Sequence, residues 1–189
     1  MIIEQATGDD LRKGVRPATL KDAADIAYIH ETVFHALFGA SHPLVPSYEQ
    51  LHAQWEQTLT QEAPDGCYTL VAIHGFRIVG FASCVPAQEI HENTVGTGKH
   101  LSIPQGTEIV NLWVERAFQR SGHGSRLLAA LVDVTQAKAL RVWVNADDES
   151  YIRFLRSAGF GPAGIRRAFS VNDSGDQQFV EHLWWALNT

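Results

Sequence analysis

The segment of residues 119–126, Gln-Arg-Ser-Gly-His-Gly-Ser-Arg, combines two glycines with two arginines. Glycine lets the main chain approach a ligand closely, and a helix that opens there presents unpaired N–H groups and the positive end of its dipole. Together these groups suit an anion such as a diphosphate, and Arg120 and Arg126 add positive charge. Gly122 and Gly124 are equally compatible with a tight strand-to-helix turn that binds nothing. The segment has neither the third glycine of a dinucleotide fingerprint nor the Gly-Lys-Ser/Thr of a P-loop.

Hydrophobic periodicity places this segment between a strand and a helix. Residues 108–114 are rich in β-branched and aromatic side chains and predict a strand. Leu127, Leu131 and Val134 recur at helical spacing and predict a helix directly after the loop. The remaining elements follow from the same two periodicities. They are strands over 15–19, 67–73, 77–85, 140–145, 164–171 and 178–187, and helices over 26–37, 48–60 and 151–158.

Local signals mark the first elements. Thr19 with Asp22, and Ser47 with Gln50, have the spacing of a capping box, which starts a helix. Pro17 lacks a main-chain donor, so the strand that contains it should lie at a sheet edge. The order of strands and helices predicts one mixed α/β domain, with helices packed on a central sheet.

Two stretches lie outside these elements. Residues 1–13 are polar and show no periodicity, which predicts a flexible leader before a domain over residues 14–189. The connection over residues 86–106 is longer than the roughly 12–15 residues of ordinary structureless loops, which suggests a lid.

The composition excludes several classes of function. The 189 residues carry a formal net charge of -6 and are 45% hydrophobic, which is typical of a globular domain and unfavourable for nucleic-acid binding. There is no apolar run of membrane-spanning length and no signal peptide at the start, so we expect a cytoplasmic protein that does not enter a membrane. The histidines show no metal-binding spacing, so we expect no metal. Cys67 and Cys84 are expected to be buried thiols, with a disulfide as the alternative.

The loop in its context resembles a known family. Gln119-x-x-Gly122-x-Gly124, after a strand that ends at Val114 and before a short helix that ends in Gly159-Phe160, is similar to the acyl-CoA-binding motifs of the GNAT superfamily of N-acetyltransferases. The resemblance covers nearly the whole chain in element order. It implies a GNAT-like α/β fold, in which a mixed, mostly antiparallel sheet of about six or seven strands is flanked by about four helices.

The resemblance also implies how acetyl-CoA would be held. The main chain around Leu112, Trp113 and Val114, next to a bulge in its strand, would pair with the pantetheine arm, and an N–H near Val114 would hold the thioester oxygen. The pyrophosphate would be held by the loop. The loop residues are Gln119, Arg120, Ser121, Gly122, His123, Gly124 and Ser125.

A general base is required because an alkyl ammonium has a pKa of about 10 and must lose a proton before it attacks a thioester. Glu108 is the candidate, because its segment resembles the one that carries the base carboxylate in the histone-acetylating branch of the family. A solvated glutamate at a strand start is the alternative. An indirect base that acts through water, with Asn111 or His123, is also open, and His123 can equally be a plain polar residue at a helix start.

The general acid departs from the family pattern. The family's usual tyrosine lies four residues before the glycine of the Gly-Phe pair, where this chain has Leu155. Tyr151 lies one helical turn earlier on the same face and is the candidate substitute, with a packed aromatic as the alternative. Asp148 stands near a position where the family often has an asparagine, and Asn145 at its strand end can serve in its place.

These observations predict an N-acetyltransferase that transfers an acetyl group from acetyl-CoA to a primary amine by direct attack in a ternary complex. The acceptor is a small-molecule amine or a peptide amine, and the family implies that a homodimer can form. The alternative is a non-catalytic acyl-CoA binding or sensing module of the same fold, which the Leu155 departure favours. A protein that binds ATP on the loop is disfavoured, because no magnesium-ligating motif accompanies it.

Overall fold

The computed structural model describes residues 13–39, 42, 45–93, 100–170 and 178–188. The helices are η2 (Leu20–Asp22), α1 (Ala23–Phe38), α2 (Tyr48–Thr60), η3 (Arg116–Phe118), α3 (His123–Thr135) and α4 (Glu149–Ser157). The strands are β1 (Lys13–Pro17), β2 (Tyr68–His74), β3 (Arg77–Ala87), β4 (Ile90–Asn93), β5 (His100–Ile103), β6 (Gly106–Val114), β7 (Ala139–Asn145), β8 (Gly161–Ser170) and β9 (Gln178–Leu187).

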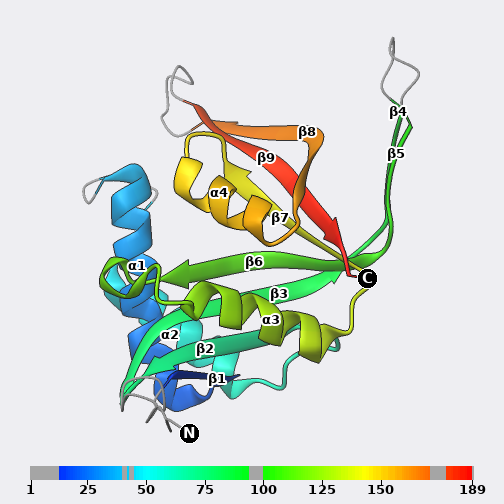
Figure 1. The fold of residues 1–189 in the computed structure, drawn as a ribbon. Coiled ribbons are helices and arrows are strands. Elements are labelled where there is room, and N and C mark those ends of the chain that lie inside the picture. Colours follow the sequence, from blue (N-terminus) through cyan, green and yellow to red (C-terminus); the bar gives the residue numbers. More distant parts are fainter. Residues whose placement is uncertain (1–12, 40–41, 43–44, 94–99, 171–177, 189) are drawn as a thin grey trace, which may run out of the picture. The chain divides into compact units, whose positions relative to one another are not determined.

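Seven of these strands form one sheet in the order β1-β2-β3-β6-β7-β9-β8 (Figure 1). The pairs β1–β2, β7–β9 and β8–β9 are antiparallel, whereas β6 and β7 are parallel. The predicted mixed, mostly antiparallel sheet with four α-helices is confirmed. The strand that contains Pro17 lies at the sheet edge, as predicted from the missing donor.

The chain divides into two compact units, which are described separately. Unit 1 comprises residues 1–83 and 111–134, and unit 2 comprises residues 84–110 and 135–189. The predicted domain over residues 14–189 stays a prediction, and most of the predicted leader lies outside the described residues.

Both predicted capping boxes are present in unit 1. The carboxylate of Asp22 accepts from the main-chain N–H and the hydroxyl of Thr19, and Arg16 lies 2.6 Å from the same carboxylate. Ser47 accepts from the N–H of Gln50, whose side chain accepts in return from the Ser47 N–H at 2.9 Å. These caps fix the starts of η2, which leads into α1, and of α2.

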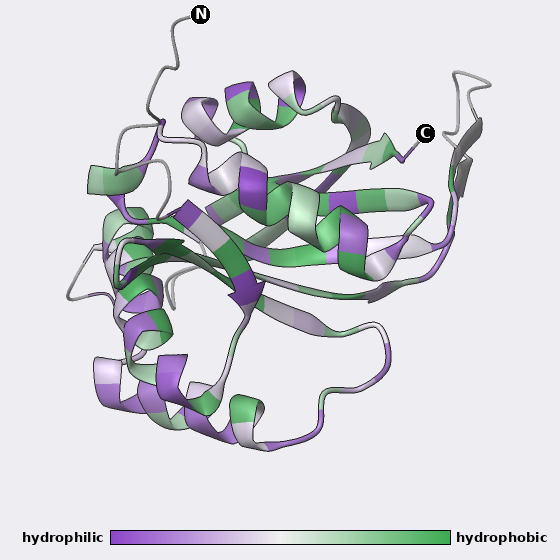
Figure 2. Cartoon of the chain, turned by 60° about the horizontal axis from the view of Figure 1, so that its bottom comes forward, coloured by the Kyte–Doolittle hydropathy of each residue, from purple (hydrophilic) through white to green (hydrophobic). Residues whose placement is uncertain are grey.

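The helices of unit 1 are amphipathic, and Figure 2 shows hydrophilic and hydrophobic residues interleaved along the helices. The apolar faces of α1 and α2 meet β2 and β3 in one core. Its buried members are Ala23, Ile26, Ala27, Ile29, Leu51, Trp55, Val71, Ile78 and Phe81. None of the helices in the described part of the chain is long and apolar enough to cross a membrane.

Unit 2 corrects one expectation about the connection over residues 86–106. Part of it is regular structure, because β4 and β5 pair in an antiparallel ribbon, with Ile90 opposite Ile103. A lid role for this ribbon stays a prediction. The last hairpin is also longer than predicted, since β8 begins at Gly161 and continues through a register shift between Pro162 and Arg166. Residues 171–177, between β8 and β9, lie outside the described residues.

Candidate active site

The strand before the glycine loop changes its pattern of burial near residue 110. Thr107 and Ile109 are buried, but the next buried side chain is Leu112, and Val110 between them is 52% exposed. The spacing between successive buried side chains thus changes from two residues to three, as a β-bulge produces. The parallel register of β6 with β7 covers residues 107–109 and 140–142. The bulge that the resemblance implies is therefore compatible with β6.

The end of β6 is held by a close approach of β3. A Cβ on Gly80 would lie 2.6 Å from the carbonyl oxygen of Trp113, so only glycine allows this approach. Directly beyond, the N–H of Glu115 donates to the carbonyl of Val79 at 2.8 Å. The main chain of Trp113 and Val114, which would meet the pantetheine arm, therefore has a fixed position within unit 1.

The loop starts from Val114 and turns sharply into α3. The Gln119 side chain donates to the carbonyl of Val114 at 3.0 Å, which ties the loop to the end of its strand. Arg120 and Gly122 both have positive φ, at 61° and 81°. These two residues reverse the chain direction, and α3 begins at His123.

The loop keeps main-chain donors unused. Arg126 reaches back and donates from Nη1 to the carbonyl of Ser121 at 3.2 Å, and its N–H donates to the carbonyl of Gly122. Among the hydrogen bonds of the described residues, none has the N–H of residues 120–122 as donor. The first N–H groups of an α-helix also lack intrahelical acceptors. The predicted anion-binding loop thus has free donors beside an arginine.

His123 is a buried residue of this loop, with only 1% of its surface exposed. Its Nε2 lies 3.1 Å from Nδ1 of His74, and its own Nδ1 has no hydrogen-bond partner. Burial lowers the pKa of His123, and His74, Arg126 and Lys13 lower it further. The imidazole is therefore neutral at physiological pH, inside the core rather than at a solvated helix start.

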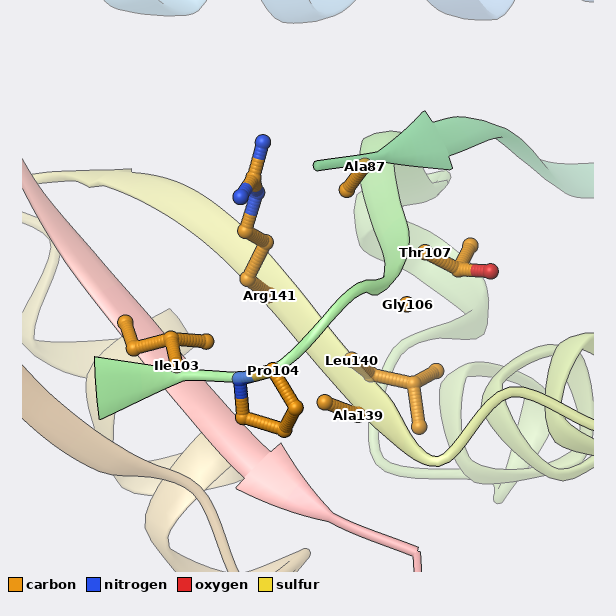
Figure 3. Close-up of a pocket in the computed structure, with 8 residues that line it drawn as sticks. All are labelled: Ala87, Ile103, Pro104, Gly106, Thr107, Ala139, Leu140 and Arg141. Carbon is orange, nitrogen blue, oxygen red and sulfur yellow. The ribbon is translucent and has the colours of Figure 1, made fainter. Parts of the chain in front are cut away.

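In unit 2, Glu108 forms an ion pair across neighbouring strands. Its carboxylate accepts from Nε of Arg141 at 2.8 Å, and the side chains are 22% and 15% exposed. Arg141 also donates from Nη1 to the carbonyl of Gln88 at 2.7 Å. Figure 3 shows Arg141 projecting from the rim of a small recess lined by residues of β7 and by the chain over residues 103–107.

Helix α4 explains the departure at the acid position. Leu155 is fully buried in the core of unit 2, so a side chain there packs. Tyr151 stacks on Phe154, with ring centroids 6.1 Å apart, and burial followed by the charge of Asp148 raises the pKa of its phenol. Asp148 caps α4 by accepting from the N–H of Tyr151 at 2.9 Å. The phenol is therefore protonated at neutral pH.

Two asparagines named from the sequence have local partners. Asn145 accepts from the N–H of Asp147 at 3.0 Å, which shapes the turn after β7. Asn111 donates from Nδ2 to Oγ of Ser83 at 2.6 Å, in unit 1. Cys67 and Cys84 are both free thiols, as predicted, but only Cys84 is buried, and Cys67 is half-buried. No three His, Cys, Asp or Glu side chains of the described residues gather as a metal site.

Comparison with known proteins identifies the family. A family model described as the acetyltransferase (GNAT) family matches residues 31–160. The chain belongs to this family. The predicted acetyltransferase and the predicted fold are therefore confirmed, and the strands and helices of this chain are those of a GNAT enzyme.

Solved structures share the GNAT fold over almost the whole chain. Ribosomal-protein-alanine N-acetyltransferase from Brucella melitensis is 21% identical, with a TM-score of 0.63, and covers 92% of this chain and 99% of its own. YncA from Salmonella typhimurium, solved with its cofactor acetyl-CoA, is 17% identical, with a TM-score of 0.60 and 93% of each chain covered. PaiA N-acetyltransferase from Thermoplasma acidophilum, in complex with coenzyme A, is 11% identical, with a TM-score of 0.56. The similarity covers 93% of this chain and 99% of the PaiA chain. No curated protein matches the sequence significantly.

The predicted site residues of this GNAT chain fall into both units. Unit 1 holds the cofactor-binding candidates of residues 112–114 and 119–125, which the Gln119 side chain and the loop geometry bring together. Unit 2 holds Glu108, Asn145 and Tyr151. Their roles as base, cofactor contact and acid stay predictions.

Two histidines were missed by the sequence reasoning. His30 follows Ile26 by four residues and so shares the apolar face of α1, and a polar residue on that face was a readable signal. His74, the partner of His123, is 49 residues away along the chain and carried no such signal.

Proposed function

We propose that this GNAT enzyme binds acetyl-CoA on the loop of residues 119–125 and transfers the acetyl group to a primary amine by direct attack in a ternary complex. The amine nitrogen attacks the thioester carbonyl carbon, the carbon–sulfur bond breaks, and coenzyme A leaves as the thiol. A main-chain N–H near Val114 would hold the oxygen on which charge develops.

The observation that carries this proposal is the set of unused N–H donors in the loop. Donors on residues 120–122 and at the first turn of α3, with Arg126 folded beside them, suit a diphosphate. Arg120 is exposed at the same loop and adds a second positive charge. The acetyl-CoA and coenzyme A in the YncA and PaiA structures support the choice of ligand.

Calorimetric titration of Gly124→Glu tests this loop. We expect the wild type to bind acetyl-CoA and coenzyme A saturably and not ATP, and the variant to lose both, because a carboxylate at the helix start repels a diphosphate. Ala129→Glu is the matched control, because it adds the same charge at an exposed position of α3. Retained binding by Gly124→Glu, or no binding by the folded wild type, contradicts the proposal.

Glu108 is the proposed base. The Glu108 carboxylate is paired with Arg141, and a carboxylate at this position can take the proton of the ammonium directly or through water. The amine then attacks, and the leaving thiolate takes a proton from Tyr151 or from water. Asn145 is the proposed further contact of the cofactor at the end of β7.

The variant Glu108→Gln tests whether Glu108 acts as a general base or only as a structural partner of Arg141. We expect kcat to fall at least roughly a hundredfold with the affinity for acetyl-CoA unchanged, which is the usual magnitude for a lost general base. Glu181→Gln is a matched control, since the Glu181 carboxylate also accepts from an arginine Nε, that of Arg167 at 2.6 Å. Full turnover by Glu108→Gln assigns Glu108 to strand pairing alone.

A non-catalytic acyl-CoA binding module is the second candidate, and the buried Leu155 favours it because no acid can act from that position. Tight acetyl-CoA binding without turnover over a broad amine panel supports this function. A cytoplasmic location and a homodimer also remain predictions.

A further inference from the structure

His30 lies within a cluster of aromatic rings in unit 1. Its ring centroid is 4.4 Å from Phe34, 4.8 Å from Trp113, 5.9 Å from Phe81 and 6.0 Å from Trp55. We call these five residues the aromatic cluster. Phe34 and Trp113 are half-buried, whereas Phe81 and Trp55 belong to the core. The cluster therefore has an inner wall and a partly accessible one.

The proton on His30 has a determined position. Nε1 of Trp55 lies 3.1 Å from Nδ1 of His30, and an indole N–H can only donate. Nδ1 must therefore accept, which leaves the imidazole proton on Nε2. Burial lowers the pKa of His30 to about 4, so the ring stays neutral at physiological pH. With Nδ1 occupied, His30 can donate a hydrogen bond but is not available as a base.

The Nε2–H of His30 has no partner among the described residues. His30 as a whole is only 9% exposed, and a polar group buried to this degree normally has a hydrogen bond. Nε2 of His30 is not among the fully buried side-chain atoms of the described residues that lack a hydrogen-bond partner. Part of this nitrogen atom therefore lies at the solvent-accessible surface. It is an open donor beside the half-buried rings.

The strand face next to this donor also carries polar groups. Ser83 is two residues from Phe81 and Asn111 is two residues from Trp113, so each shares the strand face of an aromatic-cluster residue. Ser83 accepts from Asn111 at 2.6 Å, so its own hydroxyl proton and the Asn111 Oδ1 remain for other partners. Trp113 directly precedes Val114, near which the thioester is proposed to bind.

We propose that the aromatic cluster recognises the acyl acceptor, and that the acceptor is an amine with an apolar or aromatic body and a neutral oxygen, such as a carbonyl, that accepts from Nε2 of His30. The body packs on Phe34 and Trp113. A neutral oxygen is required because the cluster offers no positive charge to a buried carboxylate. This inference rests on the proposed transferase and narrows its substrate to amino-acid amides, amino-terminal peptides or amines of like chemistry.

Imidazole NMR of the wild type with coenzyme A bound tests the recognition without turnover. The probes are L-phenylalaninamide and phenethylamine, which share the ring and the amine and differ by one carboxamide. We expect the Hε2 signal of His30 to shift on titration with the amide and not with phenethylamine. Equal shifts with both amines, or no shift with either, overturn the proposal. Acetyl-CoA binding that persists in that case leaves the proposed transferase standing.

The variant His30→Phe keeps a ring and removes the donor. We expect kcat/KM for L-phenylalaninamide to fall at least tenfold, to the value for phenethylamine, while that for phenethylamine is unchanged. His52→Phe, at a half-buried position of α2 outside the aromatic cluster, is the control and should change neither. A His30→Phe variant that loses activity equally on both amines shows that His30 acts in packing alone.

Discussion

Two histidines of unit 1 are both buried and both neutral, but their surroundings give them different properties. His30 lies among aromatic rings and accepts from an indole that can only donate, so one tautomer is fixed. His123 bonds to a second histidine, and either imidazole can be the donor in that pair. Burial decides the charge in both places, whereas the chemistry of the partner decides where the proton lies.

Because of this difference, we assign substrate recognition to His30 and a packing role to His123. A fixed tautomer gives His30 one open donor that can select a substrate. The Nδ1 of His123 is buried without a hydrogen-bond partner, and His123 is only 1% exposed, so we expect this pair to act in packing at the glycine loop.

Acidification should have the largest effect, and it should act mainly through His30. The folded pKa is about 4 and the ordinary value is 6.5, so between them the unfolded state binds the extra proton. The stability from neutral His30 is fully present above pH 6.5 and is lost as the pH falls toward 4, by about 3 kcal/mol. Denaturant unfolding at several pH values measures this loss.

His30→Phe is the control for that measurement, because it has no group to titrate at this site. The pKa of His123 is also lowered, so His123 acts in the same direction. If the loss of stability at low pH persists in His30→Phe and disappears in His123→Phe, His123 rather than His30 is the main titrating group.

Trp55→Phe should have the next largest effect. It removes the donor that fixes His30 and part of a buried ring, which should reduce the free energy of unfolding by about 2 kcal/mol. Trp113→Phe is the control, since Trp113 contacts the same imidazole without a hydrogen bond to it. Imidazole NMR should show mixed tautomers in Trp55→Phe alone. A single Nε2–H tautomer in that variant would show that Trp55 does not set the proton position.

The smallest effect is expected for the His74–His123 pair. A double-mutant cycle with His74→Phe and His123→Phe should give a coupling free energy of about 1 kcal/mol, typical of a neutral hydrogen bond. The same cycle with His74 and the distant His52 is the control, and we expect it to give no coupling free energy. A coupling of zero in the first cycle would mean that the 3.1 Å contact contributes nothing to stability.

Local features of the fold were predictable from the sequence. The capping boxes at Thr19 and Ser47 start their helices as predicted, and Pro17 lies in an edge strand. The position of the glycine loop between a strand and a helix, now β6 and α3, was also predicted correctly. The ribbon of β4 and β5 was missed, because its strands are four residues each and too short for a periodic signal.

Apart from the β4–β5 ribbon, the sequence by itself determined the order of the strands and α-helices, the glycine loop with its arginines and the family, because capping, periodicity and turn chemistry act over a few neighbouring residues. Only the tertiary structure decided the partners of individual side chains. It paired Glu108 with Arg141, buried His123 against His74 and locked His30 against Trp55. These partners are 25 to 49 residues apart along the chain, and packing of the folded chain alone brings them within hydrogen-bond distance.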